Sequence, residues 1–222
     1  MTTARPVRLV LVRHGESEWN AAGILQGHGG PGLTARGHAQ AAATARMLAR
    51  DHPGLAALAR SDLPRVVETA APTEELAAVT VQADERLREI DVGSWSGLTR
   101  AQAAAADPER YGAWAGGRDV APGGGETFAE LRARVVEGLA DVVAAVGSHG
   151  AESPAVVVFT HGGPIRVAVA AALGLPAGGH RSVKPVGNCA VSVLDVPGAG
   201  ALAAGKAHLV AYNRVGHLAI QP

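Results

Sequence analysis

The sequence predicts an α/β protein with three layers, in which helices cover both faces of a central, mainly parallel β-sheet. Two apolar runs, at 7–12 and 155–160, are typical of strands buried on both faces. Helical patterns alternate with the strand patterns, which favours parallel strands joined by helices. Hydrophobic residues make up 47% of the chain and aromatic residues only 3%, so a sizeable aliphatic core is expected. We therefore expect one domain over residues 1–222.

The first half of the chain alternates strand and helix patterns. The strand at 7–12 is followed by glycines and other turn formers at 23–32. Thr34 then precedes an Ala-rich helical pattern that should stop before Pro53, because proline disfavours helix at its own position and at the one before. The next predicted elements are a strand at 55–60, a helix that is capped by Asp62 and runs towards Leu76, and a short strand at 79–81.

Positions 90–125 hold scattered glycines, prolines and two tryptophans, with one short helix expected at 100–106. Long irregular stretches inside compact domains are usually functional loops. We therefore predict a lid or insertion at about 90–125. Within it, Tyr111, Trp114 and Arg118 either contact a sugar or carboxylate of a substrate or face solvent.

The last third of the chain supplies the second strand that is buried on both faces. Thr127 and Glu130 resemble a capping box, and apolar residues recur at helical spacing from Phe128 to Val146. The remaining predicted elements are the strand at 155–160, a helix at 164–173, and two strands at 191–193 and 209–211 that complete the sheet.

Composition argues against several classes of function. With 20 basic and 20 acidic side chains the formal net charge is zero, which gives no global attraction to nucleic acid or a membrane surface. Cys189 is the only cysteine, so neither a disulfide framework nor a multi-cysteine zinc site is expected. The apolar stretch before Arg13 is too short for a signal peptide or a membrane span, and a cytoplasmic enzyme is expected. We expect no metal and no cofactor, and a homodimer is compatible with the sequence.

Two histidines follow the two most apolar strands. The strand at 7–12 runs into Arg13-His14-Gly15, and the strand at 155–160 runs into His161-Gly162-Gly163. Because ligands bind beyond the carboxyl ends of parallel strands, both histidines should lie at one edge of the sheet. Arginines there can fork around a phosphate, and a neutral imidazole can attack phosphorus while the nearby cations keep protons off the ring.

These residues belong to a longer series of motifs. In chain order they are RHGESEWN at 13–20, QG at 26–27, LTARG at 33–37, SDLPR at 61–65, LRE at 87–89, GSWSGL at 93–98, GET at 125–127 and THGGPIR at 160–166. This series resembles that of the histidine phosphatase superfamily, also called the phosphoglycerate mutase-like family. The resemblance implies a phosphoglycerate mutase-like fold and phosphoryl transfer through a phosphohistidine.

The resemblance also implies a role for each matching residue. His14 corresponds to the nucleophile and Glu89 to the proton donor, which would protonate the leaving alkoxide and then activate water. The residues implied to be catalytic are His14, Glu89, His161, Arg13 and Arg65. Those implied to bind substrate phosphate are Arg13, Ser17, Asn20, Gln26, Gly27, Arg65, His161 and Gly162.

Taken singly, several of these residues have simpler explanations. Arg65 on a helix is typical of a solvated face, and Glu89 lies in a charged run where a surface carboxylate is the usual finding. Glu126 suits the start of a helix and is left out of catalysis. Trp19 and Trp95 are expected to be packing residues near the site.

The same motifs separate branches of the family. His161 is followed by glycines and not by an acidic residue, so the acid should be Glu89. Mutases of the family usually carry Glu-Arg-His-Tyr at the acid and an Arg-Arg pair in the next loop, whereas this chain has EIDV at 89–92 and WAG at 114–116. Each lost charged hydrogen bond weakens the hold on a bisphosphorylated intermediate by about 1.5–3 kcal/mol, so water should intercept the phosphoenzyme.

The sequence therefore predicts a metal-independent phosphomonoesterase for a small phosphorylated metabolite, either a sugar phosphate or a phosphoglycerate-type compound. Length and motif layout are similar to those of bacterial broad-specificity phosphatases and glucosyl-3-phosphoglycerate phosphatases. Two alternatives are kept. One is a cofactor-dependent phosphoglycerate mutase, and the other is a non-catalytic module that binds phosphate or a phosphoprotein.

Overall fold

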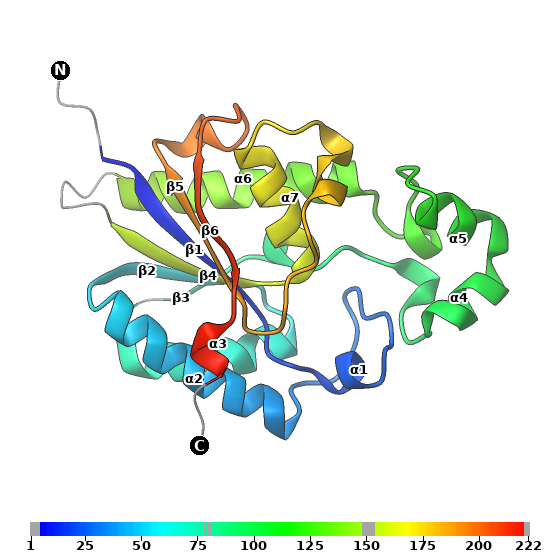
Figure 1. The fold of residues 1–222 in the computed structure, drawn as a ribbon, viewed down its shortest axis with the longest axis horizontal. Coiled ribbons are helices and arrows are strands. Elements are labelled where there is room, and N and C mark those ends of the chain that lie inside the picture. The colour runs from blue at the N-terminus through cyan, green and yellow to red at the C-terminus, as the bar shows by residue number, and fades with distance from the viewer. Residues whose placement is uncertain (1–4, 78, 80, 148–153, 220–222) are drawn as a thin grey trace.

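The computed structural model describes residues 5–77, 79, 81–147 and 154–219. At its centre is a six-stranded sheet with the order β3-β2-β4-β1-β5-β6 (Figure 1). The strands are β1 (Val7–Arg13), β2 (Leu55–Arg60), β3 (Val81–Ala83), β4 (Ala155–Thr160), β5 (Val191–Val196) and β6 (His208–Arg214). The pairings among β3, β2, β4 and β1 are parallel, and β5 and β6 join through antiparallel pairings. The expected α/β architecture is confirmed, with a mixed sheet.

The strands β1 and β4 are neighbours at the buried centre of this sheet. Val10 of β1 pairs in register with Val157 of β4, and both side chains are fully buried. Alternate residues of β1 enter opposite layers, since Leu9 and Leu11 belong to one apolar cluster and Val10 and Val12 to the other. Both faces of the strand are therefore covered, which explains why it reads as a nearly uninterrupted apolar run.

Helices supply the two outer layers. On one face of the sheet lie α2 and α3, and on the other lie α6 and α7 (Figure 1). Their bounds are Ala35–Asp51, Pro64–Ala77, Phe128–Gly147 and Gly162–Ala172, in that order. Each buries an aliphatic side chain completely, with Leu48 and Val66 on the first face and Leu131 and Ile165 on the second. Burying one such side chain stabilises the fold by about 1.5–3 kcal/mol relative to exposing it.

Two of the predicted helix starts are confirmed in atomic detail. The hydroxyl of Thr34 accepts a hydrogen bond from the Gly37 N–H (3.0 Å) at the start of α2. At the start of α6, the Glu130 N–H donates to Thr127 Oγ1 (3.2 Å) and the Thr127 N–H donates to the Glu130 carboxylate (2.8 Å). Each such cap satisfies a backbone donor that the helix itself cannot pair.

Three predicted boundaries were wrong by a few residues. Asp62 does not cap α3, which begins at Pro64, because its carboxylate binds the Arg88 guanidinium (2.7 Å). The helix α7 begins two residues before the predicted 164. The strand predicted at 79–81 is observed as β3 from Val81, and position 80 lies outside the described residues.

The segment at 90–125 contains more helix than predicted. Besides α4 (Arg100–Ala106), it forms α5 (Pro108–Ala115), which begins at a proline because proline suits the first helical position. The rings of Trp95, Tyr111 and Trp114 pack together with centroids 5.5–5.7 Å apart. The two helices project from the end of the sheet at which the short helix α1 (Glu18–Ala21) also lies (Figure 1).

Short 3₁₀ turns connect these elements at η1 (Glu85–Leu87), η2 (Gly93–Trp95), η3 (Pro122–Gly124), η4 (Ala177–Ser182), η5 (Ala199–Ala201) and η6 (Gly216–Leu218). Across the described part of the chain, no helix combines the length and the apolar character needed to cross a bilayer.

Candidate active site

The two predicted histidines meet at the carboxyl ends of β1 and β4. These strands are parallel neighbours, and Arg13 pairs in register with Thr160 just before the histidines. The His14 N–H donates to the Thr160 carbonyl (2.9 Å), and the rings of His14 and His161 lie 5.2 Å apart. Both side chains are buried, with 2% and 0% exposure. The juxtaposition that the strand ends predicted is confirmed.

The hydrogen bonding of His14 leaves one ring nitrogen ready to react. Its Nδ1 lies 2.7 Å from the Gly15 carbonyl oxygen, which can only accept, so Nδ1 carries the hydrogen and Nε2 keeps a free lone pair. Burial holds the pKa of His14 well below its ordinary value, and the charges of Arg13 and Arg65 lower it further. The His14 ring is therefore neutral at neutral pH.

His161 is held in the same neutral state by a different partner. Its Nε2 lies 3.0 Å from Ser61 Oγ, and Ser61 Oγ also accepts a hydrogen bond from the Leu63 N–H. The Ser61 hydroxyl hydrogen is thus free to point at Nε2, and in that arrangement the ring hydrogen of His161 is on Nδ1. Burial, followed by the charge of Arg65, keeps the pKa of His161 well below its usual value.

Arg13 and Arg65, which were predicted to bind phosphate, each keep an N–H donor free beside His14. Arg13 donates from Nη1 to the Val186 carbonyl (2.6 Å), and Arg65 donates to the carbonyls of Gly29 and Gly27 (2.8 Å each). The Nε atoms of both arginines, like His161 Nδ1, are buried without a partner in the described chain. An unpaired buried donor costs about 1–3 kcal/mol, so this convergence is typical of a site built for an anion. Arg65 is 1% exposed, so the solvated-face explanation for it is wrong.

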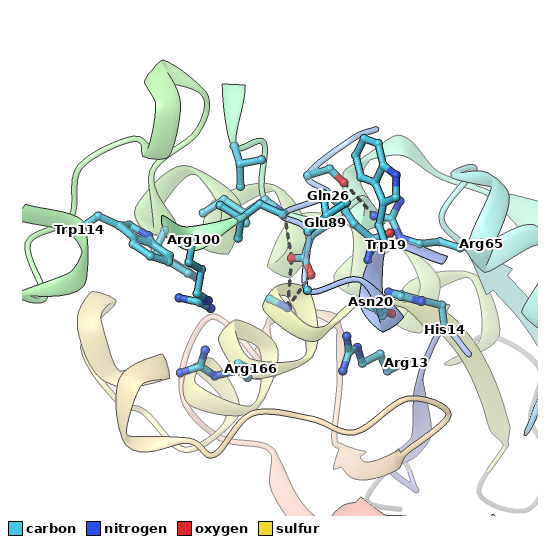
Figure 2. Close-up of a pocket in the computed structure, with 18 residues that line it drawn as sticks. Arg13, His14, Trp19, Asn20, Gln26, Arg65, Glu89, Arg100, Trp114 and Arg166 are labelled. Atoms are coloured by element: carbon cyan, nitrogen blue, oxygen red, sulfur yellow. Dashed lines mark hydrogen bonds between the residues drawn. The ribbon is translucent and has the colours of Figure 1, made fainter. Parts of the chain in front are cut away.

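A cavity of ≈ 340 Å³ opens onto these residues. Figure 2 shows His14, Arg13 and Arg65 at one end of it and Arg100, Arg166 and Trp114 towards the other. Of the residues predicted for the site, those that line the cavity are Arg13, His14, Asn20, Gln26, Gly27, Arg65 and Glu89. Ser17, His161 and Gly162 are not among the lining residues.

Glu89 reaches the cavity from the loop after η1. Its carboxylate accepts hydrogen bonds from the Gly163 N–H (3.1 and 3.2 Å) and from the Ile90 N–H (2.9 Å). Gly163 belongs to the first turn of α7, where free N–H groups and the helix dipole favour a carboxylate. The simpler explanation of Glu89 as an ordinary surface carboxylate is wrong, because Glu89 lines the same cavity as His14.

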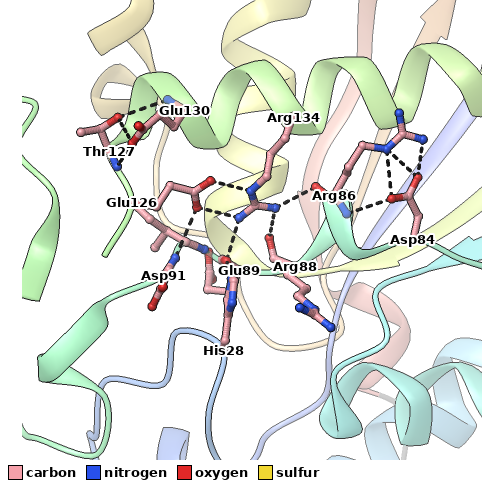
Figure 3. Close-up of polar contacts among 11 residues, drawn as sticks. His28, Asp84, Arg86, Arg88, Glu89, Asp91, Glu126, Thr127, Glu130 and Arg134 are labelled. Atoms are coloured by element: carbon pink, nitrogen blue, oxygen red, sulfur yellow. Dashed lines mark hydrogen bonds and ion pairs between the residues drawn. The ribbon is translucent and has the colours of Figure 1, made fainter. Parts of the chain in front are cut away.

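Arg134 of α6 fixes the backbone that carries Glu89. Its Nη groups donate to the carbonyls of Arg86, Arg88 and Glu89 (2.8 Å each), as Figure 3 shows. Its remaining two N–H groups bind the Glu126 carboxylate at 2.6 and 2.7 Å. All five donors of the guanidinium are thereby used. Glu126 is thus an ion-pair partner of Arg134 and not merely a residue at a helix start. No local sequence pattern predicted a role for Arg134.

The loop at 14–20 is held by side chains rather than by the sheet. The Ser17 hydroxyl donates to Gln26 Oε1 (2.9 Å) and accepts from the Asn20 N–H (3.2 Å), so it caps α1. Direct contact of Ser17 with phosphate stays a prediction. Asn188, which the sequence did not single out, donates from Nδ2 to the carbonyls of His14 and Gly15 and to Asn20 Oδ1 (3.0–3.2 Å).

The outer half of the cavity differs from the prediction. Trp114 lines it, whereas Tyr111 packs against Trp95 and Arg118 lies on a separate surface hollow. Trp19 also lines the cavity, so its description as a packing residue was incomplete, while Trp95, at 1% exposure, does pack in the core. Two cations were missed altogether, and they are Arg100 and Arg166.

The profile of the histidine phosphatase superfamily (branch 1) matches residues 9–205. The chain belongs to this family. The motif resemblance is therefore confirmed.

Known histidine phosphatases resemble the chain over most of its length. It is 36% identical over 194 residues to glucosyl-3-phosphoglycerate phosphatase of Mycobacterium tuberculosis, which is 86% of each chain. The solved structure of mycobacterial glucosyl-3-phosphoglycerate phosphatase Rv2419c with VO3 superposes with a TM-score of 0.82 and 34% identity, covering 96% of this chain and 100% of that one. The bifunctional protein Rv2228c of M. tuberculosis is 39% identical over 168 residues. These residues are 76% of this chain but only 44% of that relative, so the chain spans less than half of its length.

Proposed function

We propose that this chain is a phosphomonoester hydrolase that acts on a small phosphorylated metabolite through a phosphohistidine at His14. The observation that carries the proposal is the state of His14, which is neutral and presents a free Nε2 lone pair in a cavity shared with Arg13 and Arg65. A nucleophile in this state needs no base to activate it.

In the first step, the phosphoryl group binds among the unpaired donors of Arg13, Arg65 and His161. Nε2 of His14 attacks phosphorus, the P–N bond forms and the ester P–O bond breaks. Glu89, in its protonated form, gives its proton to the leaving alkoxide and becomes a carboxylate. The fixed arginine donors stabilise the charge on the equatorial oxygens without reorganising.

In the second step, water attacks the phosphohistidine from the side that the alcohol has left. The Glu89 carboxylate takes a proton from this water, the P–N bond breaks, and inorganic phosphate leaves. Glu89 is again protonated and His14 again neutral, so the cycle closes without a metal or a cofactor. Asn20, Gln26 and Gly27 contribute further contacts on the cavity wall, and Ser17 and Gly162 are proposed to bind the phosphate as well, although neither lines the cavity.

The substrate class that we propose is a sugar phosphate or a phosphoglycerate-type compound. Support comes from the names of the relatives, since two of those described above are glucosyl-3-phosphoglycerate phosphatases. The segment at 90–125 is proposed to act as a lid over this substrate, because Trp114 lines the outer cavity. A cytoplasmic location and a homodimer remain predictions, to be tested by cell fractionation and by light scattering.

Phosphate release in the presence of EDTA tests the proposal. We expect the wild-type protein to hydrolyse p-nitrophenyl phosphate in EDTA and His14→Ala to be inactive, whereas His208→Ala, a change at an exposed histidine on β6, should stay active. Full activity of His14→Ala would overturn the nucleophile assignment. Binding of phosphate without turnover would favour the non-catalytic module, and rapid isomerisation of 3-phosphoglycerate with bisphosphoglycerate, without phosphate release, would favour the mutase.

A further inference from the structure

The cavity at His14 continues into a second hollow of ≈ 270 Å³, here called the outer hollow. The two spaces share four lining residues, so they form one connected surface. The residues of the outer hollow that matter here are Arg100, Trp114, Phe128, Arg166, His180 and Arg181. No carboxylate is among its lining residues.

Three arginines from three separate elements meet at the outer hollow. Arg100 begins α4, Arg166 lies on α7, and Arg181 lies on η4. Within the described ranges, none of the three has a carboxylate oxygen within 4.0 Å, whereas Arg86 and Arg134 are both paired with acidic side chains. Converging cations that lack an ion-pair partner repel one another, and the Glu89 carboxylate of the adjoining cavity acts on Arg166 only from a distance, so this arrangement favours an anion between them.

The guanidinium groups are held in place by contacts that leave donors free. Arg166 donates from Nε to the Val183 carbonyl (3.0 Å) and from Nη2 to the His180 carbonyl (2.8 Å), and no protein acceptor takes its Nη1 in the described chain. Burial lowers the pKa of Arg166 most, interactions with Tyr212 and Glu89 act against this effect, and the charge of Arg181 adds to it. An arginine that is already oriented loses less entropy when it binds an anion.

The other two cations are fixed through Trp114. Arg181 donates from Nη2 to the Trp114 carbonyl (3.2 Å), and the guanidinium of Arg100 lies 5.3 Å from the centre of a Trp114 ring. Also lining the outer hollow, His180 stacks on Phe128 with ring centroids 3.9 Å apart. Figure 2 shows Arg100 and Arg166 pointing toward one another across the cavity, farther from His14 than Arg13 is.

We infer that the outer hollow binds a second anionic group of the substrate, a carboxylate or a second phosphate, while the scissile phosphate lies at His14. The inference rests on the proposed function, since the hollow is an extension of that cavity. The chain lacks the Arg-Arg pair that mutases of the family carry in the loop after the acid, but arginines on α4, α7 and η4 supply positive charge in its place. Preferred substrates are therefore phosphomonoesters that carry a further negative charge.

Matched substrate pairs test this inference at two lengths. In 3-phosphoglycerate and glycerol 3-phosphate the difference is one carboxylate, and 6-phosphogluconate and glucose 6-phosphate form a longer pair of the same kind. Fructose 1,6-bisphosphate and fructose 6-phosphate make the comparison for a second phosphate. In at least one pair, we expect kcat/KM to be at least about tenfold higher for the member with the additional anionic group. This factor corresponds to the binding free energy of two exposed ion pairs.

The variant Arg100→Gln/Arg181→Gln removes two of the three charges at exposed positions. It should lower the ratio of kcat/KM between the charged and uncharged members about tenfold, through KM rather than kcat. Arg118→Gln, on the separate hollow of the same segment, is the matched control and should leave the ratio unchanged. Circular dichroism of each variant would show whether the fold is retained.

The outcomes separate the inference from the proposed function. A wild-type protein that hydrolyses p-nitrophenyl phosphate but shows no preference for the charged member of any pair would overturn the anion subsite alone. So would a preference that Arg100→Gln/Arg181→Gln leaves unchanged. A wild-type protein that hydrolyses none of these compounds would instead overturn the proposed function.

Discussion

Arg134 offers a sharp test of how the acid is positioned. Arg134→Met keeps the length and the apolar stem of the side chain but removes all five N–H donors. The Glu126 carboxylate, whose side chain is 15% exposed, would lose its partner, and three backbone carbonyls would lose a donor each. Breaking a buried ion pair costs about 3–5 kcal/mol, and the residual exposure of this pair favours the lower end. A loss of about 3 kcal/mol should lower the Tm by roughly 6–12 °C in a chain of this size.

The same change should alter the dependence of the rate on the leaving group. A poor alkoxide leaving group needs the proton of Glu89, whereas p-nitrophenolate leaves without one. We expect kcat/KM for glucose 6-phosphate to fall about 30-fold in Arg134→Met, since displacement of a catalytic group by about 1 Å can cost up to about 100-fold. For p-nitrophenyl phosphate the fall should be less than about threefold, since its step does not use the acid.

The control is Arg132→Met on the same helix. Arg132 donates to the carbonyls of Leu175 and Pro176 (2.8 and 3.0 Å) and, within the described part of the chain, makes no hydrogen bond to the acid loop at 86–91. It should affect both substrates equally. If Arg134→Met lowered the two rates by the same factor, or lowered only the Tm, then Arg134 would be a structural residue without influence on the position of Glu89.

Three further outcomes follow from the site. Glu89→Gln should lower kcat/KM for glucose 6-phosphate by about 10²–10⁴-fold and spare p-nitrophenyl phosphate, and an equal loss on both would remove its role as acid. A lysine at position 65 cannot both keep the two hydrogen bonds to the Gly27 and Gly29 carbonyls and bind phosphate through paired donors. In Arg65→Lys the Ki of inorganic phosphate as a competitive inhibitor should therefore rise at least about tenfold. An unchanged Ki would contradict the role of Arg65 in phosphate binding. The depressed pKa values of His14 and His161 mean that the unfolded chain binds protons that the folded chain does not. Stability from this source is complete above the ordinary histidine pKa of about 6.5 and is lost as the pH falls below it, by up to about 1.4 kcal/mol per pH unit for each ring. The free energy of unfolding, measured with urea at pH 7.5 and 5.5, should fall less between these two pH values in His161→Asn than in the wild-type protein. An equal fall in both proteins would contradict the depressed pKa of His161.

The strand ends are the part of the site that local sequence could predict. A strand buried on both faces produces an apolar run, and the residue after such a run lies at a known edge of a parallel sheet. His14 and His161, which are 147 positions apart in the chain, are therefore predicted to be neighbours, and their rings lie 5.2 Å apart. The capping box of Thr127 and Glu130 likewise placed the start of α6 correctly, because such a cap is a contact between residues three apart.

The positioning contacts could not be predicted in this way. Arg134 meets residues 45–48 positions earlier in the chain, and Asn188 meets residues 168–174 positions earlier. Neither residue lies in a motif with a local physical signature, so only the tertiary structure brings the partners together. The arginines of the outer hollow illustrate the same limit, since they come from three separate elements of the chain.

One helix was missed for a local reason. The stretch at 90–125 was predicted to be largely irregular because glycine and proline usually interrupt helices. At α5, however, proline is at the first helical position and Asp107 accepts a hydrogen bond from the Arg110 N–H (3.3 Å), so the same residues start a helix. The helix matters for function because it places Trp114 on the cavity wall.

Direct detection of the phosphoenzyme tests the central claim. The protein would be mixed with p-nitrophenyl phosphate, quenched in alkali within milliseconds to preserve a P–N bond, digested, and analysed by mass spectrometry. We predict a single phosphoryl group on the peptide that contains His14, and its absence from His14→Asn. A phosphoryl group on His161 or on another side chain, or an active enzyme that never carries one, would contradict the account.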